Sequence, residues 1–266
     1  MCLIWFSYQN TPGFRLLLAA NRDEFFARPT TPLAWRDNIL AGWDEQGNGT
    51  WLGINRLGQI AALTNHRDPA RQRPNPPSRG GIIPGYLHSG QMAAAFLQQL
   101  REEAQHYNPF NLLLLDSKEM LFYSNADDRL EQVGTGAQAL SNRFLDTEWP
   151  KTRRIKELLA PLALSPSMAP GQIDPEPFFT ALRDRHQPED SQLPASGVSI
   201  EWERILAPVF IDSPSYGTRS SALVAIGDDG QVDFYERSYE RGDGLALTAS
   251  DKYVRFNLSH TGRSRA

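Results

Sequence analysis

The stretch MCLIWFSY, residues 1–8, is apolar at almost every position and rich in aromatic side chains. A run of this length and composition predicts a buried β-strand. Cys2, the only cysteine of the chain, stands at the start of that strand. A central strand would hold this end of the chain rigidly, whereas a free terminus would fray. We therefore expect the fold to be organised around a strand that begins at Cys2.

Cys2 is also the first candidate for chemistry. A small residue at position 2 normally allows the initiator methionine to be removed, so we expect Cys2 to become the first residue. A free α-amino group titrates near pH ~8 and a thiol near ~8.5. The amine can therefore take the thiol proton, and one residue can supply both nucleophile and base. The alternative is a small buried hydrophobic residue without chemistry, because a reactive cysteine needs an activating environment.

The composition narrows the classes of function. The chain has 266 residues, 40% hydrophobic and 22% charged, which is enough to bury a core. A net charge of −4 argues against binding to nucleic acid or to an anionic membrane. One cysteine excludes an internal disulfide, and the five scattered histidines lack metal-ligand spacing, so we expect no metal. The chain shows no apolar run of ~18 residues and no secretory signal, which predicts a cytoplasmic protein without integral membrane association.

The first predicted strand is the first half of a hairpin. A turn at residues 10–13 separates it from a second apolar run at residues 14–20. The polar cluster Asn21-Arg22-Asp23-Glu24 follows that run, at a strand end where catalytic groups are often presented. If the two strands are antiparallel, this cluster lies close to Cys2.

The rest of the chain predicts a mixture of hairpins and a few helices. We expect short strands at 41–44, 50–55 and 59–65, an irregular proline-rich loop at 68–81, a helix at 83–103, a hairpin at 110–124, a strand ending at 139–142, helices at 149–162 and 174–185, a loop at 186–197, a last hairpin at 218–239 and a frayed end at 260–266. Antiparallel strands with helices grouped mid-chain indicate a layered α+β fold. No boundary is evident, so residues 1–266 are predicted to form one domain.

Polar groups gather at several predicted strand ends, and together they complete a site for acyl transfer. The common nucleotide, metalloprotease and serine-hydrolase motifs do not occur. A carboxylate such as Asp23 would hold the α-ammonium group, an asparagine amide would donate to the oxyanion, and an arginine would favour the thiolate. Each group could instead be structural, because asparagine favours turns and Asp–Arg pairs are common at surfaces. The groups are Asn21, Arg22 and Asp23; Asn65, His66 and Arg67; Ser141, Asn142 and Arg143; and Thr218, Arg219, Ser220 and Ser221.

Seven co-linear motifs run along the chain: MC (1–2), NRDE (21–24), TNHR (64–67), YNPFNL (107–112), LSN (140–142), WPK (149–151) and YGTRSS (216–221). Together they strongly resemble the NRDE family, whose eukaryotic members are called transport and Golgi organisation protein 2. The resemblance covers nearly the whole chain. It implies links to secretory-pathway organisation, lipid and acyl-CoA metabolism and haem trafficking, without an agreed reaction.

Two further segments, GINRLGQIAALTN (53–65) and ANRD (20–23), carry a more distant resemblance. The first is similar to a hairpin, and the second to the R-N-x-D segment, of N-terminal-nucleophile hydrolases of the penicillin V acylase and bile salt hydrolase type. The resemblance implies a four-layer αββα sandwich with Cys2 as nucleophile. It also implies that Asp23 holds the amine, Asn142 helps to form the oxyanion hole and Arg219 is the late-chain arginine. Ala20 stands where those hydrolases carry an arginine, and we do not expect Arg22 to take its place.

The leading hypothesis is an N-terminal-cysteine hydrolase that acts on an amide or thioester of a small acylated molecule. Its catalytic residues would be Cys2, Asp23, Asn65, Asn142 and Arg219, and its substrate-binding residues Asn21, Arg22, His66 and Arg67. No cofactor is expected. The alternative is a protein without catalysis that uses the same pocket to bind and traffic haem or an acyl-CoA-like lipid.

Overall fold

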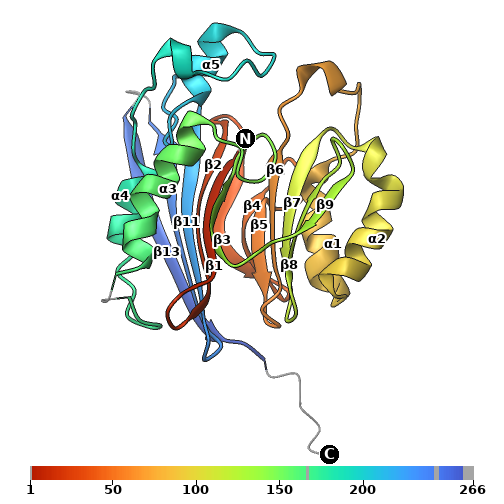
Figure 1. Ribbon diagram of the computed structural model, residues 1–266, viewed down its shortest axis with the longest axis vertical. Helices are drawn as coiled ribbons and strands as arrows, with labels where there is room; N and C mark the ends of the chain where they lie inside the picture. Colours follow the sequence, from red (N-terminus) through yellow and green to blue (C-terminus); the bar gives the residue numbers. More distant parts are fainter. Residues whose placement is uncertain (1, 166–167, 243–245, 260–266) are drawn as a thin grey trace, which may run out of the picture.

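The computed structural model describes residues 2–165, 168–242 and 246–259, in which two antiparallel sheets pack face to face (Figure 1). β1 and β2 form the predicted hairpin, and β11 pairs with the other edge of β2. Among the described residues, this first sheet has the strand order β10 (Gly136–Leu140), β1 (Cys2–Thr11), β2 (Phe14–Phe25), β11 (Tyr216–Gly227), β12 (Gln231–Arg241) and β13 (Leu247–Asn257).

The second sheet is a meander in which each strand pairs with the next along the chain. Its strands are β3 (Thr30–Arg36), β4 (Ile39–Asp44), β5 (Leu52–Asn55), β6 (Ile60–Asn65), β7 (Phe110–Leu115), β8 (Met120–Ser124) and β9 (Arg129–Gln132). A right-handed twist in each sheet lets the two faces interlock over a shared apolar layer.

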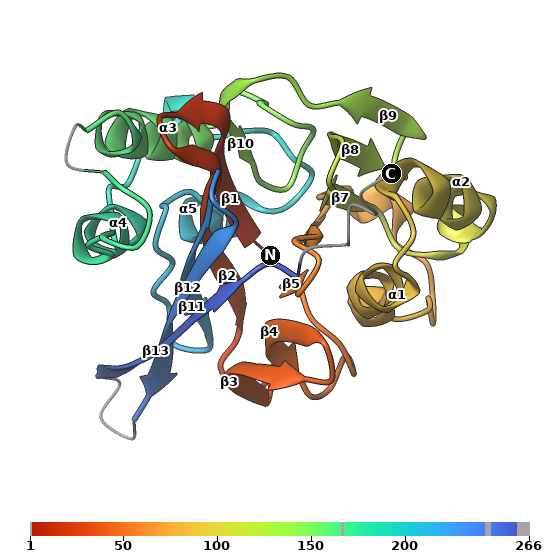
Figure 2. The ribbon, with the colours of Figure 1, turned by 90° about the horizontal axis from the view of Figure 1, so that it is seen from below.

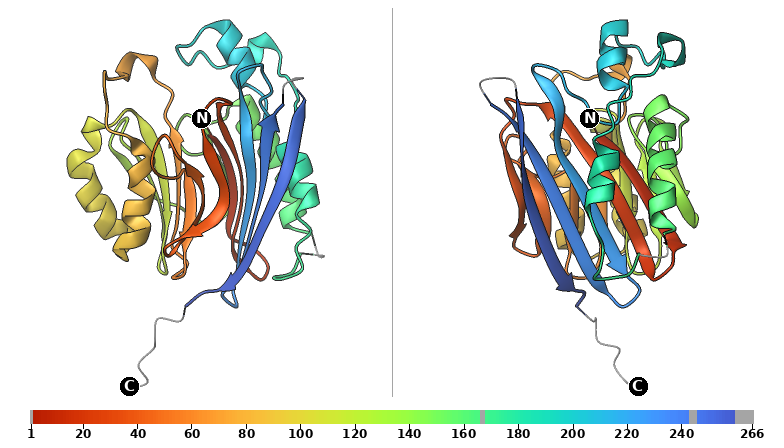
Figure 3. Two further views of the ribbon diagram at one scale, coloured as in Figure 1. Left: turned by 180° about the vertical axis from the view of Figure 1, so that it is seen from behind. Right: turned by 90° about the vertical axis from the view of Figure 1, so that its left-hand side faces the viewer.

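Helices cover the outer face of each sheet, as the view from below makes plain (Figure 2). α1 (Ile82–Ser89) and α2 (Ala93–Glu103) lie on the second sheet, and α3 (Pro150–Ala163) and α4 (Glu176–Leu182) lie on the first. α5 (Ile200–Leu206), drawn in cyan, sits at the end of the sandwich where β1 starts (Figure 3). No helix in the described ranges is long and apolar enough to span a membrane.

Three separate apolar clusters fill the three interfaces between these layers. β1 shows how one strand serves two of them, because successive side chains on a strand point to opposite faces. Ile4 and Phe6 pack between the sheets, whereas Leu3 and Trp5 pack under α3 and α4. All four side chains are at most 1% exposed, so the strand is buried on both faces. The predicted four-layer αββα sandwich is confirmed.

Several predicted elements differ from those observed. One helix was expected at 83–103, but Gly90 adopts a left-handed conformation with φ 65° and separates α1 from α2. The helix expected at 174–185 is shorter, because α4 covers only Glu176–Leu182. β3, β9, β13 and α5 were not predicted at all, and the expected frayed end at 260–266 lies outside the described residues.

The pairing of β1 with β2 fixes the neighbourhood of Cys2. β2 continues to Phe25, so the NRDE cluster lies inside the strand and not beyond its end. The register places Cys2 opposite Arg22, and Asp23 opposite Thr218 of β11. The prediction that the NRDE cluster lies close to Cys2 is therefore confirmed.

Candidate functional site

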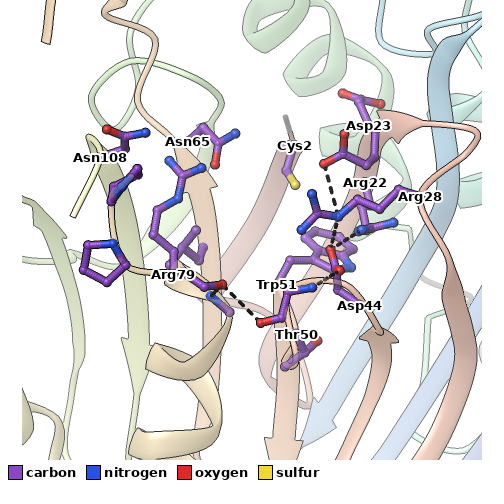
Figure 4. Close-up of a pocket in the computed structure, with 17 residues that line it drawn as sticks. Cys2, Arg22, Asp23, Arg28, Asp44, Thr50, Trp51, Asn65, Arg79 and Asn108 are labelled. Atoms are coloured by element: carbon purple, nitrogen blue, oxygen red, sulfur yellow. Dashed lines mark hydrogen bonds and ion pairs between the residues drawn. The ribbon is translucent and has the colours of Figure 1, made fainter. Parts of the chain in front are cut away.

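A pocket of about 270 Å³ opens beside Cys2, between the ends of the two sheets (Figure 4). β1 and β2 contribute Cys2, Arg22 and Asp23 to one wall. β6 contributes Asn65 to the opposite side, and the proline-rich segment of residues 76–80 forms a rim with Arg79 pointing inward. The lining is largely polar and charged, which suits a small polar ligand better than a bulky apolar one.

Cys2 lies at the inner end of this pocket with only 6% of its surface exposed. Burial raises the pKa of the thiol to about 11, while Arg22 and a backbone hydrogen bond from Asp23 act in the opposite direction. At neutral pH the resting thiol is therefore protonated. Nucleophilic attack by Cys2 requires a base within reach of its proton.

Asp23 is buried next to Cys2 and is held from β11. Thr218 Oγ1 donates to its carboxylate at 2.8 Å, and Tyr216 Oη donates to its backbone oxygen at 3.0 Å. Burial raises the pKa of this carboxyl, and the charge of Lys151 is the strongest influence that lowers it. Asp23 is thus placed to orient a positive group beside Cys2.

We did not expect Arg22 to replace the arginine that the hydrolases carry at the position of Ala20. Its side chain nevertheless reaches the pocket. Residues two apart on a strand share a face, so Arg22 follows Ala20 on the side that faces the second sheet. Its guanidinium pairs with Asp44 at 2.6 Å. Arg28 pairs with the same carboxylate at 2.7 Å, and Gly47 donates its backbone N–H to it. Two arginines therefore share one carboxylate on this wall, which leaves the three groups with a net positive charge.

Asn65 and Asn142 meet at the opposite side of the pocket. The Asn142 side-chain amide donates to the backbone oxygen of Asn65 at 2.9 Å, so Asn142 braces the end of β6. Asn142 itself does not line the pocket, whereas Asn65 does. The side chain of Asn65 makes no hydrogen bond to any of the described residues and is labelled at the pocket wall in Figure 4. An amide in this position can donate to an oxyanion.

Lys151 is a buried charge near this site and lies outside the set of predicted site residues. It lies in the first turn of α3, 3% exposed, with Nζ 3.4 Å from Asn142 Oδ1. Burial and the charge of Arg67 lower the pKa of Lys151 to about 8, while Asp23 and Cys2 raise it. The Trp-Pro-Lys motif was the available signal, but a lysine early in a helix is usually solvent-exposed.

Asn142 is one of five predicted site residues that lie away from the pocket lining, and the other four are Asn21, Arg219, His66 and Arg67. Asn21 donates to the backbone oxygens of Leu182 and Val209, which ties β2 to the outer helical layer. Arg219 donates to the backbone oxygens of Phe25, Phe26 and Arg28, which shapes the turn after β2.

His66 and Arg67 follow β6 but point elsewhere. His66 Nδ1 lies 3.4 Å from Asn111 Oδ1, and Arg143 donates to its Nε2 at 3.2 Å. Arg67 forms a buried ion pair with Glu203 at 3.0 Å and lies over the ring of Trp149. The described residues contain no cluster of three or more histidine, cysteine or acidic side chains that could hold a metal ion.

Comparison with known proteins adds family relationships to this geometry. A family model described as Transport and Golgi organisation 2 matches residues 1–241. The Transport and Golgi organization 2 homolog of Mus musculus is 33% identical over 262 residues, which cover 90% of this chain and 93% of the mouse protein. Transport and Golgi organization protein 2 of Drosophila melanogaster is 25% identical and covers 98% of this chain and 97% of its own.

Two solved structures share a looser likeness. A C2A mutant of conjugated bile acid hydrolase from Clostridium perfringens is 10% identical with a TM-score of 0.43, and covers 97% of each chain. The Caenorhabditis elegans ortholog of N-acylethanolamine-hydrolyzing acid amidase is also 10% identical, with a TM-score of 0.41, and covers 83% of this chain and 91% of its own. These similarities are too weak to carry an argument about function.

Proposed function

This chain belongs to the Transport and Golgi organisation 2 family, and we propose that it acts as an N-terminal-cysteine hydrolase on an amide or thioester of a small acylated molecule. The observation that carries the proposal is the position of Cys2. It starts a central strand, lies at the inner end of a polar pocket, and has the buried carboxylate of Asp23 beside it. A buried carboxylate at this point has a clear role if the neighbouring group is the α-amine of Cys2.

The reaction would proceed in two steps after removal of Met1. In the first, the neutral α-amine of Cys2 takes the thiol proton while Sγ attacks the carbonyl carbon of the substrate. The carbon–nitrogen or carbon–sulfur bond breaks, the leaving group takes the proton, and a thioester remains on Cys2. In the second, water attacks this thioester, the acid leaves, and the thiol regains its proton. Asp23 orients the amine in both steps and stabilises the ammonium group that forms while the amine holds the proton.

Asn65 is the proposed oxyanion donor in both steps. Its side-chain amide faces the pocket, and the backbone that carries it is held by Asn142. Donors that are already fixed before the reaction stabilise a developing negative charge best. In this proposal Asn142 is therefore a positioning residue for Asn65.

The second candidate function is binding and trafficking of haem or an acyl-CoA-like lipid in the same pocket. The raised thiol pKa of about 11 favours it, because a protonated buried thiol is a poor nucleophile. The small polar pocket opposes it for a ligand as large as haem, since sites that enclose drug-sized ligands usually exceed ~300 Å³. The two functions predict different effects of removing the thiol. A hydrolase would lose turnover, whereas a carrier would keep its bound ligand.

The test is turnover of a panel of amides and thioesters by the wild-type chain and by Cys2→Ala and Cys2→Ser. All three keep a small residue at position 2, so removal of Met1 is matched. We expect Cys2→Ala to lose turnover completely, with an unchanged far-UV spectrum and unfolding midpoint, and Cys2→Ser to retain only a trace. Turnover that persists in Cys2→Ala would refute the hydrolase, and unchanged retention of a bound ligand would support the carrier.

A further inference from the structure

The arginines that line the pocket beside Cys2 differ in whether a carboxylate lies close to them. Arg22 and Arg28 both contact Asp44, and Arg28 also approaches Glu24 at 3.8 Å. Arg79 is the remaining arginine of the lining, and no carboxylate of the described residues lies within 4 Å of it. The single hydrogen bond of its side chain to the described residues runs from Nη1 to the backbone oxygen of Pro109 at 3.1 Å. The guanidinium therefore has donors left for a ligand.

Arg79 faces the same space as Cys2. In Figure 4 its side chain rises along the wall opposite Cys2 and ends beside Asn65. Burial lowers the pKa of Arg79, and the Cys2 thiolate is the largest influence in the opposite direction. The two groups thus lie within electrostatic reach of each other across the pocket. A partly buried guanidinium without a counter-charge is costly unless a ligand supplies one.

Backbone packing holds Arg79 in this position. The Ser78 hydroxyl oxygen accepts a hydrogen bond from the backbone N–H of Gly80, and the Gly80 carbonyl accepts one from the backbone N–H of Thr50. Gly49 lies so close that an added Cβ would meet the Gly80 oxygen at 1.8 Å. The contact between the two glycine loops leaves no room for a side chain. The backbone that carries Arg79 is therefore fixed, and the side chain is held by its hydrogen bond to Pro109.

We propose that Arg79 forms an anion subsite, which binds a carboxylate or phosphate group of the molecule whose acyl bond lies at Cys2. This inference rests on the proposed function and narrows its substrate class to anionic acyl compounds. Arginine binds both groups through two parallel N–H donors, and a partly buried pocket strengthens that contact. Neutral substrates of the same shape would lose this contact.

The test compares two thiol reagents of nearly equal shape, anionic iodoacetate and neutral iodoacetamide. The rate of Cys2 modification by each is measured by intact mass and divided by its rate with N-acetylcysteine. We expect the wild-type chain to favour iodoacetate about tenfold, the effect of one charge-assisted contact. Arg79→Gln should remove this preference, and Arg79→Lys should restore part of it. Arg71 is an exposed arginine of the proline-rich loop at residues 68–81, and Arg71→Gln is the matched control that should leave the preference unchanged.

Protection identifies the anion. Inorganic phosphate and glutarate are each tested for their ability to slow the modification of Cys2 by iodoacetamide. Stronger protection by phosphate indicates a phosphate ligand, and stronger protection by glutarate indicates a carboxylate ligand. An equal iodoacetate preference in the wild-type chain and in a folded Arg79→Gln variant would overturn the subsite. If neither reagent modifies Cys2, the proposed hydrolase fails. The subsite is then tested by thermal unfolding. It is supported if phosphate or glutarate raises the unfolding midpoint of the wild-type chain but not that of Arg79→Gln, and overturned otherwise.

Discussion

At the scale of single residues, the site consists of groups whose ionisation is set by burial. Cys2 has a raised thiol pKa, Asp23 a raised carboxyl pKa and Lys151 a lowered ammonium pKa, and burial is the main cause in each case. These shifts all disfavour charge, so each group depends on its neighbours to ionise. Among these neighbours, Lys151 is the group that most strongly favours the ionised form of Asp23.

Replacing Lys151 with methionine should move the acidic limb of the pH–rate profile to higher pH. Asp23 must be ionised to orient the amine, and loss of the Lys151 charge raises the pKa of Asp23 further. The rate of Cys2 acylation, measured from pH 4 to 9 in the Met1-free chain, reports this limb. Lys156→Met is the control, because Lys156 lies on the same helix and pairs with Glu148 near the surface. An acidic limb that stays in place in a folded Lys151→Met variant would contradict this role.

At the scale of elements, the sequence predicted most strands of the core and the edge strand β10, but not the edge strands β3, β9 and β13. β1, β2, β7, β8 and β11 are strongly apolar runs bounded by turns, which is the pattern a buried strand requires. β9 and β13 have mostly exposed residues, so their sequences carry little apolar signal. They are strands because their neighbours β8 and β12 offer unpaired backbone groups.

The sequence predicted only those parts of the candidate site that follow from local strand pairing. Register alone brings Arg22 and Asp23 to Cys2, and register follows from a hairpin with a recognisable turn. Lys151 and Arg79 come from a distant helix and a distant loop. Their approach to Cys2 depends on how the layers pack, which no local pattern in the sequence reports.

Glu236 of β12 gives a prediction about the contact between two strands of different sheets. Its carboxylate accepts from the backbone N–H of Leu33 in β3 at 2.7 Å, and burial raises its pKa from 4.5 to about 7. The folded chain binds this proton more tightly than the unfolded chain, so stability falls as the pH rises from 4.5 through 7. The loss is on the order of 3 kcal/mol for a shift of this size.

Glu236→Gln should remove that fall, because the amide keeps an oxygen acceptor for Leu33 and carries no charge. Urea unfolding at several pH values between 4 and 8 measures the effect, and the variant should be the more stable protein at pH 8. Glu240→Gln, an exposed position on the same strand, should leave the pH dependence as it is. The account of Glu236 is wrong if the wild-type decline persists in Glu236→Gln.

At the scale of the whole molecule, the pocket exists because two sheets meet at one end of the sandwich. The first sheet supplies the nucleophile and the carboxylate, and the second supplies Asn65 and the loop that carries Arg79. The apolar layer between the sheets fixes the distance between these two walls. The site is thus a property of the packed layers, and both sheets must be in place before its parts face each other.

The intact mass of the purified chain shows whether Cys2 is a reactive N-terminal nucleophile. The mass is recorded before and after brief exposure to a thiol-directed acylating probe at neutral pH. We expect a chain that lacks Met1 and gains a single adduct, which is absent in Cys2→Ala. Retention of Met1, or an unmodified thiol in a chain that lacks it, would contradict the account and favour the carrier.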